Sequence, residues 1–160
     1  MLKIKIGIGY DIHRLVQGEK LYLGGIKIPF PKGLLGHSDG DCLIHAIVDA
    51  VLGAAGKGDI GMFFPDTDPE YKNISSRKIL KDVIGMMKTQ GWEIANIDSI
   101  IIAEAPKMGP YIPEMKKALC PILELSEEDL GIKAKTNEGI GELGRGNAIA
   151  AWAAAFLKKP

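Results

Sequence analysis

An acidic residue and a histidine stand two positions apart near the start of the chain, as Asp11 and His13. Residues at positions i and i+2 of a β-strand point to the same face, so these side chains can converge on one ion. Carboxylate oxygen and imidazole nitrogen both suit Zn²⁺, which needs further ligands beyond these two. For this motif alone, a surface acid–histidine pair is the simpler interpretation. Gly7 and Gly9 on the same face favour a metal, because they leave space beside the backbone.

Another histidine, His45, lies in a segment with helical apolar spacing and completes a candidate three-ligand site with Asp11 and His13. Asp41 and Asp49 lie one helical turn before and after His45, so either carboxylate can accept the imidazole N–H that a metal does not use. Three protein ligands leave one position open, which is typical of catalytic zinc. A partly buried helix histidine without a metal is the alternative.

Polar residues in two other segments could hold an anion or a polyol. His37 and Ser38 precede the predicted helix, where backbone N–H groups and a hydroxyl can bind a phosphate. An equal alternative is that Ser38 only caps the helix. Asp59, Asp66 and Asp68 lie in a segment rich in Gly and Pro. Asx turns and helix caps explain them, and hydrogen bonds to the hydroxyls of a small polar substrate are the alternative.

Two segments in the second half of the chain carry groups suited to a nucleotide. Residues 103–109 follow an apolar strand and present backbone amides and carbonyls that can recognise the edge of a base. Within them, Lys107 could meet a phosphate or remain solvated. Further along, Thr136 can donate to a phosphoryl oxygen and Glu138 can bind Mg²⁺. Arg145, between two glycines, is a candidate phosphate or packing partner.

Familiar nucleotide motifs are absent from this chain. The segment with Gly7 and Gly9 lacks the third glycine of a dinucleotide motif, because position 12 is Ile. The segment 56–58 lacks the spaced glycine and the hydroxyl of a P-loop. Cys42 and Cys120 have no activating neighbours, so we interpret both as small apolar residues.

The composition indicates one globular domain. The chain has 160 residues, 46% of them hydrophobic and 25% charged, which predicts a single domain over 1–160 and excludes disordered, coiled-coil and collagen-like chains. Twenty basic and twenty acidic residues cancel, so we expect neither nucleic acid nor a membrane as partner. The N-terminus predicts no signal peptide, and the alanine-rich stretch 148–157 is too short to span a bilayer. Two cysteines fit a reducing compartment, and we expect a cytoplasmic protein.

Periodicity and turn residues predict the elements that must position these groups. The predicted strands are residues 2–13, 94–103 and 132–135, with a tight hairpin at 21–28 around two glycines, after which the prolines and glycine of 29–33 end the strand character. The predicted helices are about 38–56, 75–90, 112–123 and 147–158, the last one from its alanine-rich face. Loops are expected at 57–74 and 138–146, the first long enough to indicate function. The order of elements predicts an α+β fold (an α/β sandwich), with a mixed sheet covered on one face by helices.

Four segments, taken in order, resemble those of the 2-C-methyl-D-erythritol 2,4-cyclodiphosphate synthase family. They read GIGYDIHR, KGLLGHSDGDCLIHAIVDAVLGAAGKGDIGMFFPDTDP, AEAPKMGPYIPEM and KAKTNEGIGELGRGNAIA, and they span nearly the whole chain. The resemblance implies an enzyme of non-mevalonate isoprenoid biosynthesis, a lyase that converts 4-diphosphocytidyl-2-C-methyl-D-erythritol 2-phosphate to the cyclic 2,4-diphosphate and CMP. It also implies a homotrimer whose active sites lie between neighbouring subunits.

The resemblance further implies metal ions with defined ligands. Asp11, His13 and His45 match zinc ligands, and the open position would hold an oxygen of the substrate's terminal phosphate for attack on the β-phosphorus. Glu138 matches the carboxylate that binds Mg²⁺ or Mn²⁺ at the nucleotide diphosphate.

The resemblance also assigns catalytic and substrate-binding positions. His37 and Thr136 match groups that stabilise the transition state by hydrogen bonds to phosphoryl oxygens. Residues 59–61 and 64–68 match segments that hold the methylerythritol portion, and 103–109 match the loop that recognises cytosine. The implied substrate-binding residues are Asp11, His13, His37, Ser38, Asp59, Ile60, Gly61, Phe64, Pro65, Asp66, Thr67, Asp68, Ala103, Glu104, Ala105, Pro106, Lys107, Met108, Gly109, Lys135, Thr136, Asn137, Glu138, Glu142 and Arg145.

This chain departs from the family pattern at a few positions. Lys135 and Asn137 stand where many relatives have threonines, so their contacts are less well defined by the resemblance. Glu142 replaces a frequent bulky apolar residue and could pair with Arg145 near the threefold axis. Asn147 replaces a frequent acidic residue, so we do not assume a ligand cavity along that axis.

Two other functions stay open when the residues are considered alone. A zinc phosphohydrolase acting on a nucleotide diphosphate would place water at the fourth zinc position, but the sequence supplies no obvious base for it. A trimeric module that binds cytidine nucleotides or isoprenoid diphosphates would be expected if a zinc ligand were missing. Cyclisation itself needs no protein base or nucleophile, because a substrate phosphate attacks.

Overall fold

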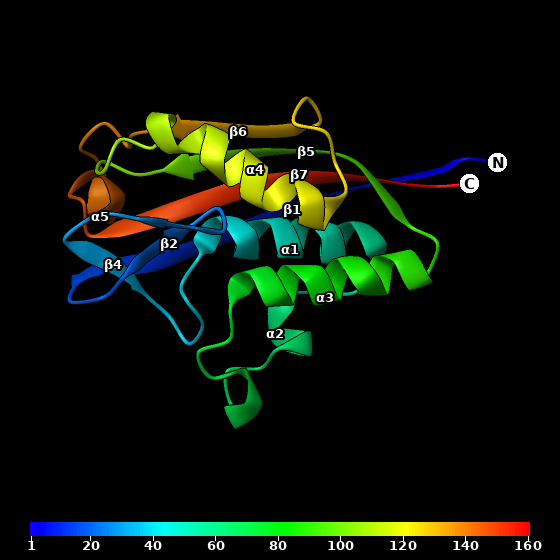
Figure 1. The fold of residues 1–160 in the computed structure, drawn as a ribbon, viewed down its shortest axis with the longest axis horizontal. Helices are drawn as coiled ribbons and strands as arrows, with labels where there is room; N and C mark the ends of the chain where they lie inside the picture. Colours follow the sequence, from blue (N-terminus) through cyan, green and yellow to red (C-terminus); the bar gives the residue numbers. More distant parts are fainter.

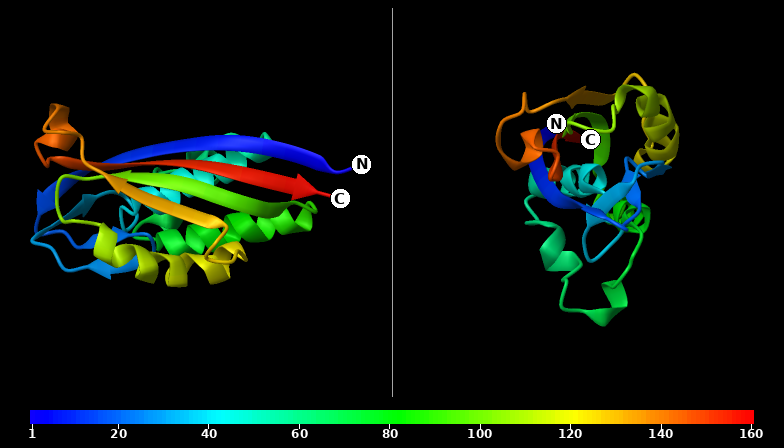
Figure 2. Two further views of the ribbon diagram at one scale, coloured as in Figure 1. Left: turned by 90° about the horizontal axis from the view of Figure 1, so that it is seen from above. Right: turned by 90° about the vertical axis from the view of Figure 1, so that its left-hand side faces the viewer.

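The computed structural model describes residues 1–160, which form a sheet with helices packed on one face (Figures 1 and 2). The strands are β1 (Lys3–Gln17), β2 (Leu21–Leu23), β3 (Ile26–Ile28), β4 (Lys32–Leu35), β5 (Glu93–Ile102), β6 (Leu130–Lys135) and β7 (Ala148–Lys159). The helices are α1 (Cys42–Ala55), α2 (Ile60–Phe63), α3 (Ser76–Thr89), α4 (Ile112–Leu123) and α5 (Gly141–Gly144), with 3-10 turns at Pro69–Tyr71 and Gly109–Tyr111.

The main sheet has five strands in the order β4-β1-β7-β5-β6. It is mixed, since β5 and β6 are parallel and the other neighbours are antiparallel. The predicted α+β architecture is therefore confirmed. The hairpin of β2 and β3 is confirmed too, and Gly24 and Gly25 at its turn both have positive φ, a conformation that glycine adopts without strain.

The prediction of a helix over residues 147–158 was wrong, because this segment forms β7 in the middle of the sheet, between β1 and β5. Ala151, Ala153 and Ala155 are buried on its helix-covered face, whereas Trp152 points to the opposite face and is 46% exposed. Alanine favours helices when isolated, but here its small side chain allows α1 to pack closely on the sheet.

The prediction that strand character ends at residues 29–33 was also wrong, since residues 32–35 form β4. β4 pairs antiparallel with the end of β1, where Leu35 lies opposite Arg14. This strand is at the edge of the sheet, a position that tolerates prolines close by. The predicted loops at 57–74 and 138–146 contain the short helices α2 and α5.

The close contact between β1 and α1 defines the helix-covered side of the molecule. Gly7 and Gly9 were expected to leave space for a ligand, and this expectation was wrong, because the backbone of α1 occupies that space. A Cβ atom at Gly9 would overlap the carbonyl oxygen of Ala46, and one at Gly7 would overlap that of Ala50. The buried face of β1 is thus its glycine face.

The opposite face of the sheet carries no helix in this chain (Figure 2). The isoleucines of β1 point to this side, and Ile6 and Ile8 are 67% and 71% exposed. Tyr10 packs against Trp152 of the neighbouring strand, with 4.6 Å between ring centroids. An exposed apolar surface of this extent is typical of a protein–protein interface.

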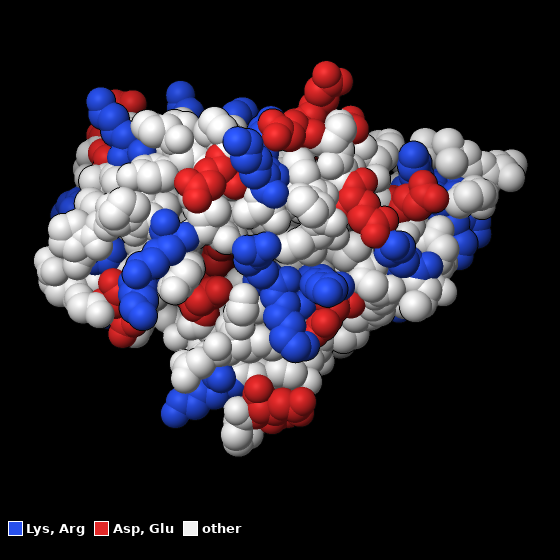
Figure 3. All heavy atoms as spheres, viewed as in Figure 1, with Lys and Arg blue, Asp and Glu red and all other residues white.

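Charge on the helix-covered face is mixed, as the composition predicts. Figure 3 shows basic and acidic side chains interspersed over the helices. Several of them pair, including Lys88 of α3 with Glu124 after α4 at 2.7 Å. No helix in this fold is both long and apolar enough to cross a membrane.

The close contact at Gly9 predicts opposite changes in stability for two glycine substitutions. We expect Gly9→Val to destabilise the fold by about 1–3 kcal/mol or more, because the added side chain must force α1 away from β1. Gly85→Ala, in α3 with nothing near its added Cβ atom, should stabilise by about 0.5–1 kcal/mol. Chemical denaturation of both variants measures this, and wild-type stability of Gly9→Val would contradict the expectation.

Candidate metal centre and its cavity

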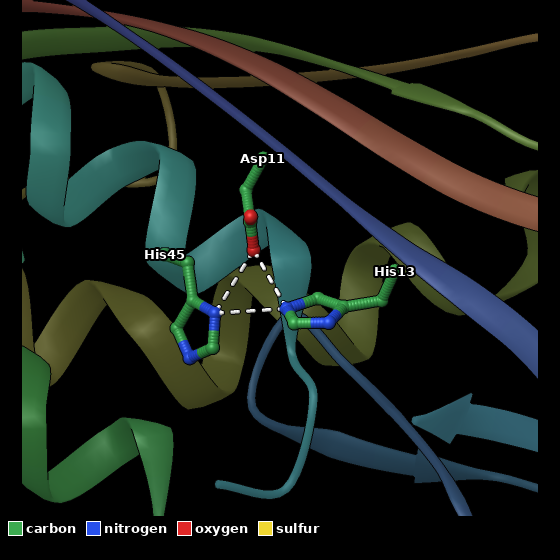
Figure 4. A group of neighbouring side chains, drawn as sticks. All are labelled: Asp11, His13 and His45. Carbon is green, nitrogen blue, oxygen red and sulfur yellow. Dashed lines mark hydrogen bonds and ion pairs between the residues drawn. The ribbon is translucent and has the colours of Figure 1, made fainter. Parts of the chain in front are cut away.

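Asp11, His13 and His45 converge on one point, although two come from β1 and one from α1 (Figure 4). Asp11 Oδ2 lies 2.9 Å from His13 Nε2 and 2.9 Å from His45 Nδ1. The two imidazole nitrogens are 3.3 Å apart. The predicted cluster is therefore confirmed as a group that could hold a metal ion.

The donor atoms fit a tetrahedral divalent ion. Bonds of about 2.0–2.1 Å to nitrogen or oxygen place tetrahedral ligands about 3.3 Å apart. The separations in the cluster come close to this value, so the atoms can form one triangular face of a tetrahedron. All of these side chains also line a cavity, into which a fourth coordination position would open.

Each histidine of the cluster places its other ring nitrogen against a hydrogen-bond partner. His13 Nδ1 lies 2.9 Å from the carbonyl oxygen of Leu35 and must be the donor, since a carbonyl only accepts. β4, which the sequence analysis missed, thus supplies the group that orients His13. His45 Nε2 lies 3.1 Å from Ser38 Oγ and 2.9 Å from Ser76 Oγ.

The prediction that Asp41 or Asp49 accepts the free imidazole N–H was wrong. The Asp41 carboxylate is buried and accepts backbone N–H groups from the hairpin turn at 2.7 and 2.9 Å and from the first turn of α1 at 3.0 Å. Asp49 accepts the N–H of Ile60 at 2.8 Å. Both carboxylates instead hold neighbouring segments against α1.

The cluster perturbs the protonation of its own members. Burial raises the pKa of Asp11, but hydrogen bonds and charges from His13 and His45 outweigh it and lower the pKa to about 2. Burial lowers the pKa of His13, but the hydrogen bond and charge of Asp11 outweigh it and raise the pKa above 6.5. The carboxylate is thus ionised at neutral pH and ready to bind a cation.

A cavity of about 830 Å³ adjoins the cluster. Predicted site residues line its walls from the loop after β4, from α2 and from the segment that follows α2. They are His37, Ser38, Ile60, Gly61, Phe64, Pro65, Asp66 and Thr67. His37 Nδ1 lies 3.7 Å from Asp66 Oδ2, and both side chains are exposed.

Two acidic residues of the same segment have structural contacts. Asp59 accepts the N–H of Met62 at the start of α2, at 3.2 Å, and Asp68 accepts that of Glu70 at 2.9 Å. Capping therefore accounts for both, as the sequence analysis allowed. Their contacts with a substrate stay a prediction.

Sequence reasoning did not predict the roles of other residues near the metal cluster. Asp49 and Tyr71 line the cavity, and the Tyr71 ring meets Phe64 edge-on with 5.3 Å between centroids. Ser76 contacts His45 from the first turn of α3. The position of Asp49 one turn after His45 was a usable signal for the cavity wall. Nothing in the local pattern marks Tyr71, and the pattern marks Ser76 only as a candidate helix cap.

The segments expected to bind a nucleotide do not reach this cavity in one chain. None of the residues 103–109 or 135–138 lines it. Figure 1 shows β6 and the end of β5 along the upper edge of the fold, whereas α2 extends below α1 and α3. The two groups of predicted site residues are therefore separate within one subunit.

Polar contacts already order the second group. Glu104 Oε1 accepts the backbone N–H of Asn137 at 2.7 Å, which joins the two segments. Thr136 Oγ1 donates to Glu138 Oε1 at 3.2 Å, so the hydroxyl and the carboxylate predicted for phosphate and metal lie side by side. Lys107 is exposed.

Other predicted groups have local partners or are inert. Glu142 pairs with Arg145, and this hydrogen bond lowers the pKa of the carboxyl. The pairing expected for these residues is confirmed. Burial raises the pKa of the Cys42 thiol and of the Cys120 thiol, which fits their interpretation as small apolar residues.

The protonation of His13 predicts the pH dependence of metal binding. Its pKa is raised in the metal-free protein, so a proton competes with the metal below that raised value. We expect the affinity for Co²⁺ to level off at alkaline pH and to fall about tenfold per pH unit for each ligand that protonates. Asp11, with its pKa of about 2, stays ionised and does not contribute. Co²⁺ titrations followed by visible absorption between about pH 5.5 and 8 measure this, and a constant affinity would contradict it.

Relatives of high identity have one shared name. The 2-C-methyl-D-erythritol 2,4-cyclodiphosphate synthase of Clostridium acetobutylicum is 53% identical, over 96% of this chain and 99% of the relative. The enzyme of the same name from Pelotomaculum thermopropionicum is 51% identical, over 98% of this chain and 96% of the relative. Both relatives are named as synthases, that is, as enzymes.

Solved structures and a family model agree with these relatives. The bifunctional IspDF of Campylobacter jejuni has 38% identity and a TM-score of 0.95, covering 100% of this chain and 43% of that chain. A CDP-bound 2C-methyl-D-erythritol-2,4-cyclodiphosphate synthase has 37% identity and a TM-score of 0.88, covering 96% of this chain and 99% of that chain. The model of the YgbB family matches residues 4–158. Because it covers nearly the full length, this chain belongs to the YgbB family.

Proposed function

We propose that this chain converts 4-diphosphocytidyl-2-C-methyl-D-erythritol 2-phosphate to 2-C-methyl-D-erythritol 2,4-cyclodiphosphate with release of CMP, in non-mevalonate isoprenoid biosynthesis. The observation that carries the proposal is the Asp11, His13 and His45 cluster, whose donor atoms face a cavity large enough for a small polar substrate. The names of the relatives supply the product, 2-C-methyl-D-erythritol 2,4-cyclodiphosphate.

The reaction needs positioning rather than a protein nucleophile. An oxygen of the 2-phosphate forms a bond to the β-phosphorus, and the bond from that phosphorus to the oxygen bridging the α-phosphate breaks. CMP leaves with that oxygen. Because the attacking group is already an anion, no side chain has to remove a proton, which agrees with the absence of an activated thiol.

Residues around the cavity would position the phosphates. Asp11, His13 and His45 would hold Zn²⁺, which supplies charge neutralisation for a phosphate oxygen. His37 would donate to a phosphoryl oxygen, and the exposure of its imidazole at the cavity wall supports this role. Ser38, on the same wall, would add a hydroxyl.

The wall formed by residues 60–61 and 64–67 would hold the methylerythritol portion. Asp66 is exposed there and would accept hydrogen bonds from the hydroxyls. Phe64 and Tyr71 form an aromatic pair that would cover the apolar side of this small group. Asp59 and Asp68, the caps of the neighbouring turns, would keep these residues in place.

Residues 103–109 would bind the cytidine, and Glu138 would hold Mg²⁺ or Mn²⁺ at its diphosphate, with Thr136 donating to a phosphoryl oxygen. The close approach of Thr136 to Glu138 supports these two neighbouring roles. The CDP complex of a relative supports the ligand class. Lys107 and Arg145 would contribute positive charge, although Glu142 already pairs with Arg145.

A homotrimer would bring the two groups of residues together. One subunit keeps the nucleotide segments away from the metal cavity, so a complete site needs a neighbouring copy. The uncovered apolar sheet face supplies a surface for such contacts, since Ile6, Ile8 and Trp152 lie exposed on it. The cytoplasmic location stays a prediction.

Phosphorus NMR tests the reaction directly. The protein with zinc and magnesium should convert the proposed substrate to CMP and a cyclic diphosphate, and a chelator should abolish turnover. His45→Ala should lose nearly all turnover, because two remaining ligands cannot hold the ion. A linear bisphosphate would contradict cyclisation and indicate a hydrolase. Binding of the nucleotide without turnover would indicate a binding module.

The trimer has a separate test. Ile8→Glu adds a charge to the uncovered face, and we expect a folded monomer that keeps its metal but loses at least tenfold in cyclisation, because the nucleotide half of the site is missing. Met62→Glu is a matched control for the oligomeric state, because Met62 is equally exposed at 71% but lies on α2. Sedimentation velocity measures the assembly. A fully active Ile8→Glu trimer would contradict the proposed interface.

A further inference from the structure

Ser76, the first residue of α3, connects the metal cluster to an acidic side chain that no part of the proposed reaction uses. Its side chain is fully buried, and its Oγ atom lies 2.9 Å from His45 Nε2. The same hydroxyl donates to Asp39 Oδ1. The other carboxylate oxygen of Asp39 accepts the backbone N–H of Ser76 at 3.0 Å.

The protons of this chain of contacts can be assigned from the chemistry of its groups. A serine hydroxyl has one proton, and a carboxylate only accepts, so the Ser76 proton lies between Ser76 and Asp39. Towards His45, the Ser76 oxygen can therefore only accept. The proton of neutral His45 must then be on Nε2, which leaves the lone pair on Nδ1.

The Nδ1 atom of His45 is the atom that faces Asp11, at 2.9 Å. The contacts on the far side of the ring thus select the tautomer that the metal cluster needs. Ser38 is compatible with this tautomer, because its Oγ lies 3.1 Å from the same Nε2 and a hydroxyl can accept as well as donate. When Ser38 Oγ accepts the Nε2 proton of His45, the Ser38 hydroxyl proton is free for another acceptor.

We propose that Asp39 and Ser76 are positioning residues that orient His45 and hold it in the tautomer with Nδ1 free to bind a divalent cation. They act through His45 and do not touch the cation. This inference rests on the metal site of the proposed function, but not on the identity of its substrate.

The structure indicates why His45 depends on this pair. The carboxylates nearest to it along its own helix are occupied, since Asp49 binds the Ile60 N–H and Asp41 binds backbone groups. Asp39 also joins the loop that carries His37 and Ser38 to the start of α3. The orientation of His45 therefore depends on Ser76, a residue with a sequence separation of 31 from it, and on Asp39 in the loop just before its own helix.

Co²⁺ titration of the purified protein without nucleotide tests the proposal. We expect Ser76→Ala and Asp39→Asn to bind Co²⁺ about 10–100-fold more weakly than the wild type. Asn cannot replace Asp39, because its amide would offer only one accepting oxygen to two donors of Ser76. Ser75→Ala is the matched control and should keep wild-type affinity, since Ser75 is exposed and makes no side-chain cap.

A measurement on the zinc-loaded wild type keeps the test independent of variant folding. The chain has 3 histidines, so long-range ¹H–¹⁵N spectra can assign each ring. We expect His45 to show zinc on Nδ1 and a slowly exchanging proton on Nε2, and Ser76→Ala should speed that exchange. Zinc on Nε2, or wild-type Co²⁺ affinity in Ser76→Ala, would overturn the proposal.

The outcome is separable from that of the proposed reaction. If phosphorus NMR shows no cyclisation while Ser76→Ala weakens Co²⁺ binding, the positioning role stands and the substrate assignment fails. If cyclisation occurs and Ser76→Ala binds Co²⁺ normally, the reaction stands and the positioning role fails.

Discussion

The close contact between α1 and the glycine face of β1 is the constraint on which the rest of the molecule depends. A side chain at Gly9 would overlap the backbone of α1, so only glycine permits this approach. The contact places His45 against Asp11, whose ligand atoms are 2.9 Å apart. A site built from a strand and a helix needs such precision, because metal–ligand distances vary by only a few tenths of an ångström. Packing of small residues is thus the origin of the site geometry.

The sheet has two faces with different tasks. One face carries the helices, the metal cluster and the cavity, whereas the other exposes apolar side chains such as Ile8 and Trp152. Gly9 and Ile8 are adjacent in the sequence and point to opposite faces, so β1 contributes to both tasks. In the proposed trimer, the same strand would hold the cation and join the subunits that complete the site.

Buried polar groups in this fold are consistently paired, and no buried side-chain polar atom lacks a hydrogen-bond partner. Asp41 satisfies N–H groups of the hairpin and of α1, which ties the small sheet to the helix layer. Asp39 does the same for the start of α3. With a net charge of zero, the chain has no broad field for an anion, so a bound cation and local donors would have to supply the attraction.

Local pattern alone determined much of this protein: the alternation of β1, the helix bounds 112–123, the hairpin glycines, and the placement of Asp11 and His13 on one strand face. Each of these depends on residues close in sequence. The tertiary structure decided that the alanine-rich segment is a central strand, that β4 orients His13, and that Ser76 rather than Asp41 or Asp49 contacts His45. These outcomes depend on hydrogen bonds and packing between distant segments, which leave no local periodicity to detect.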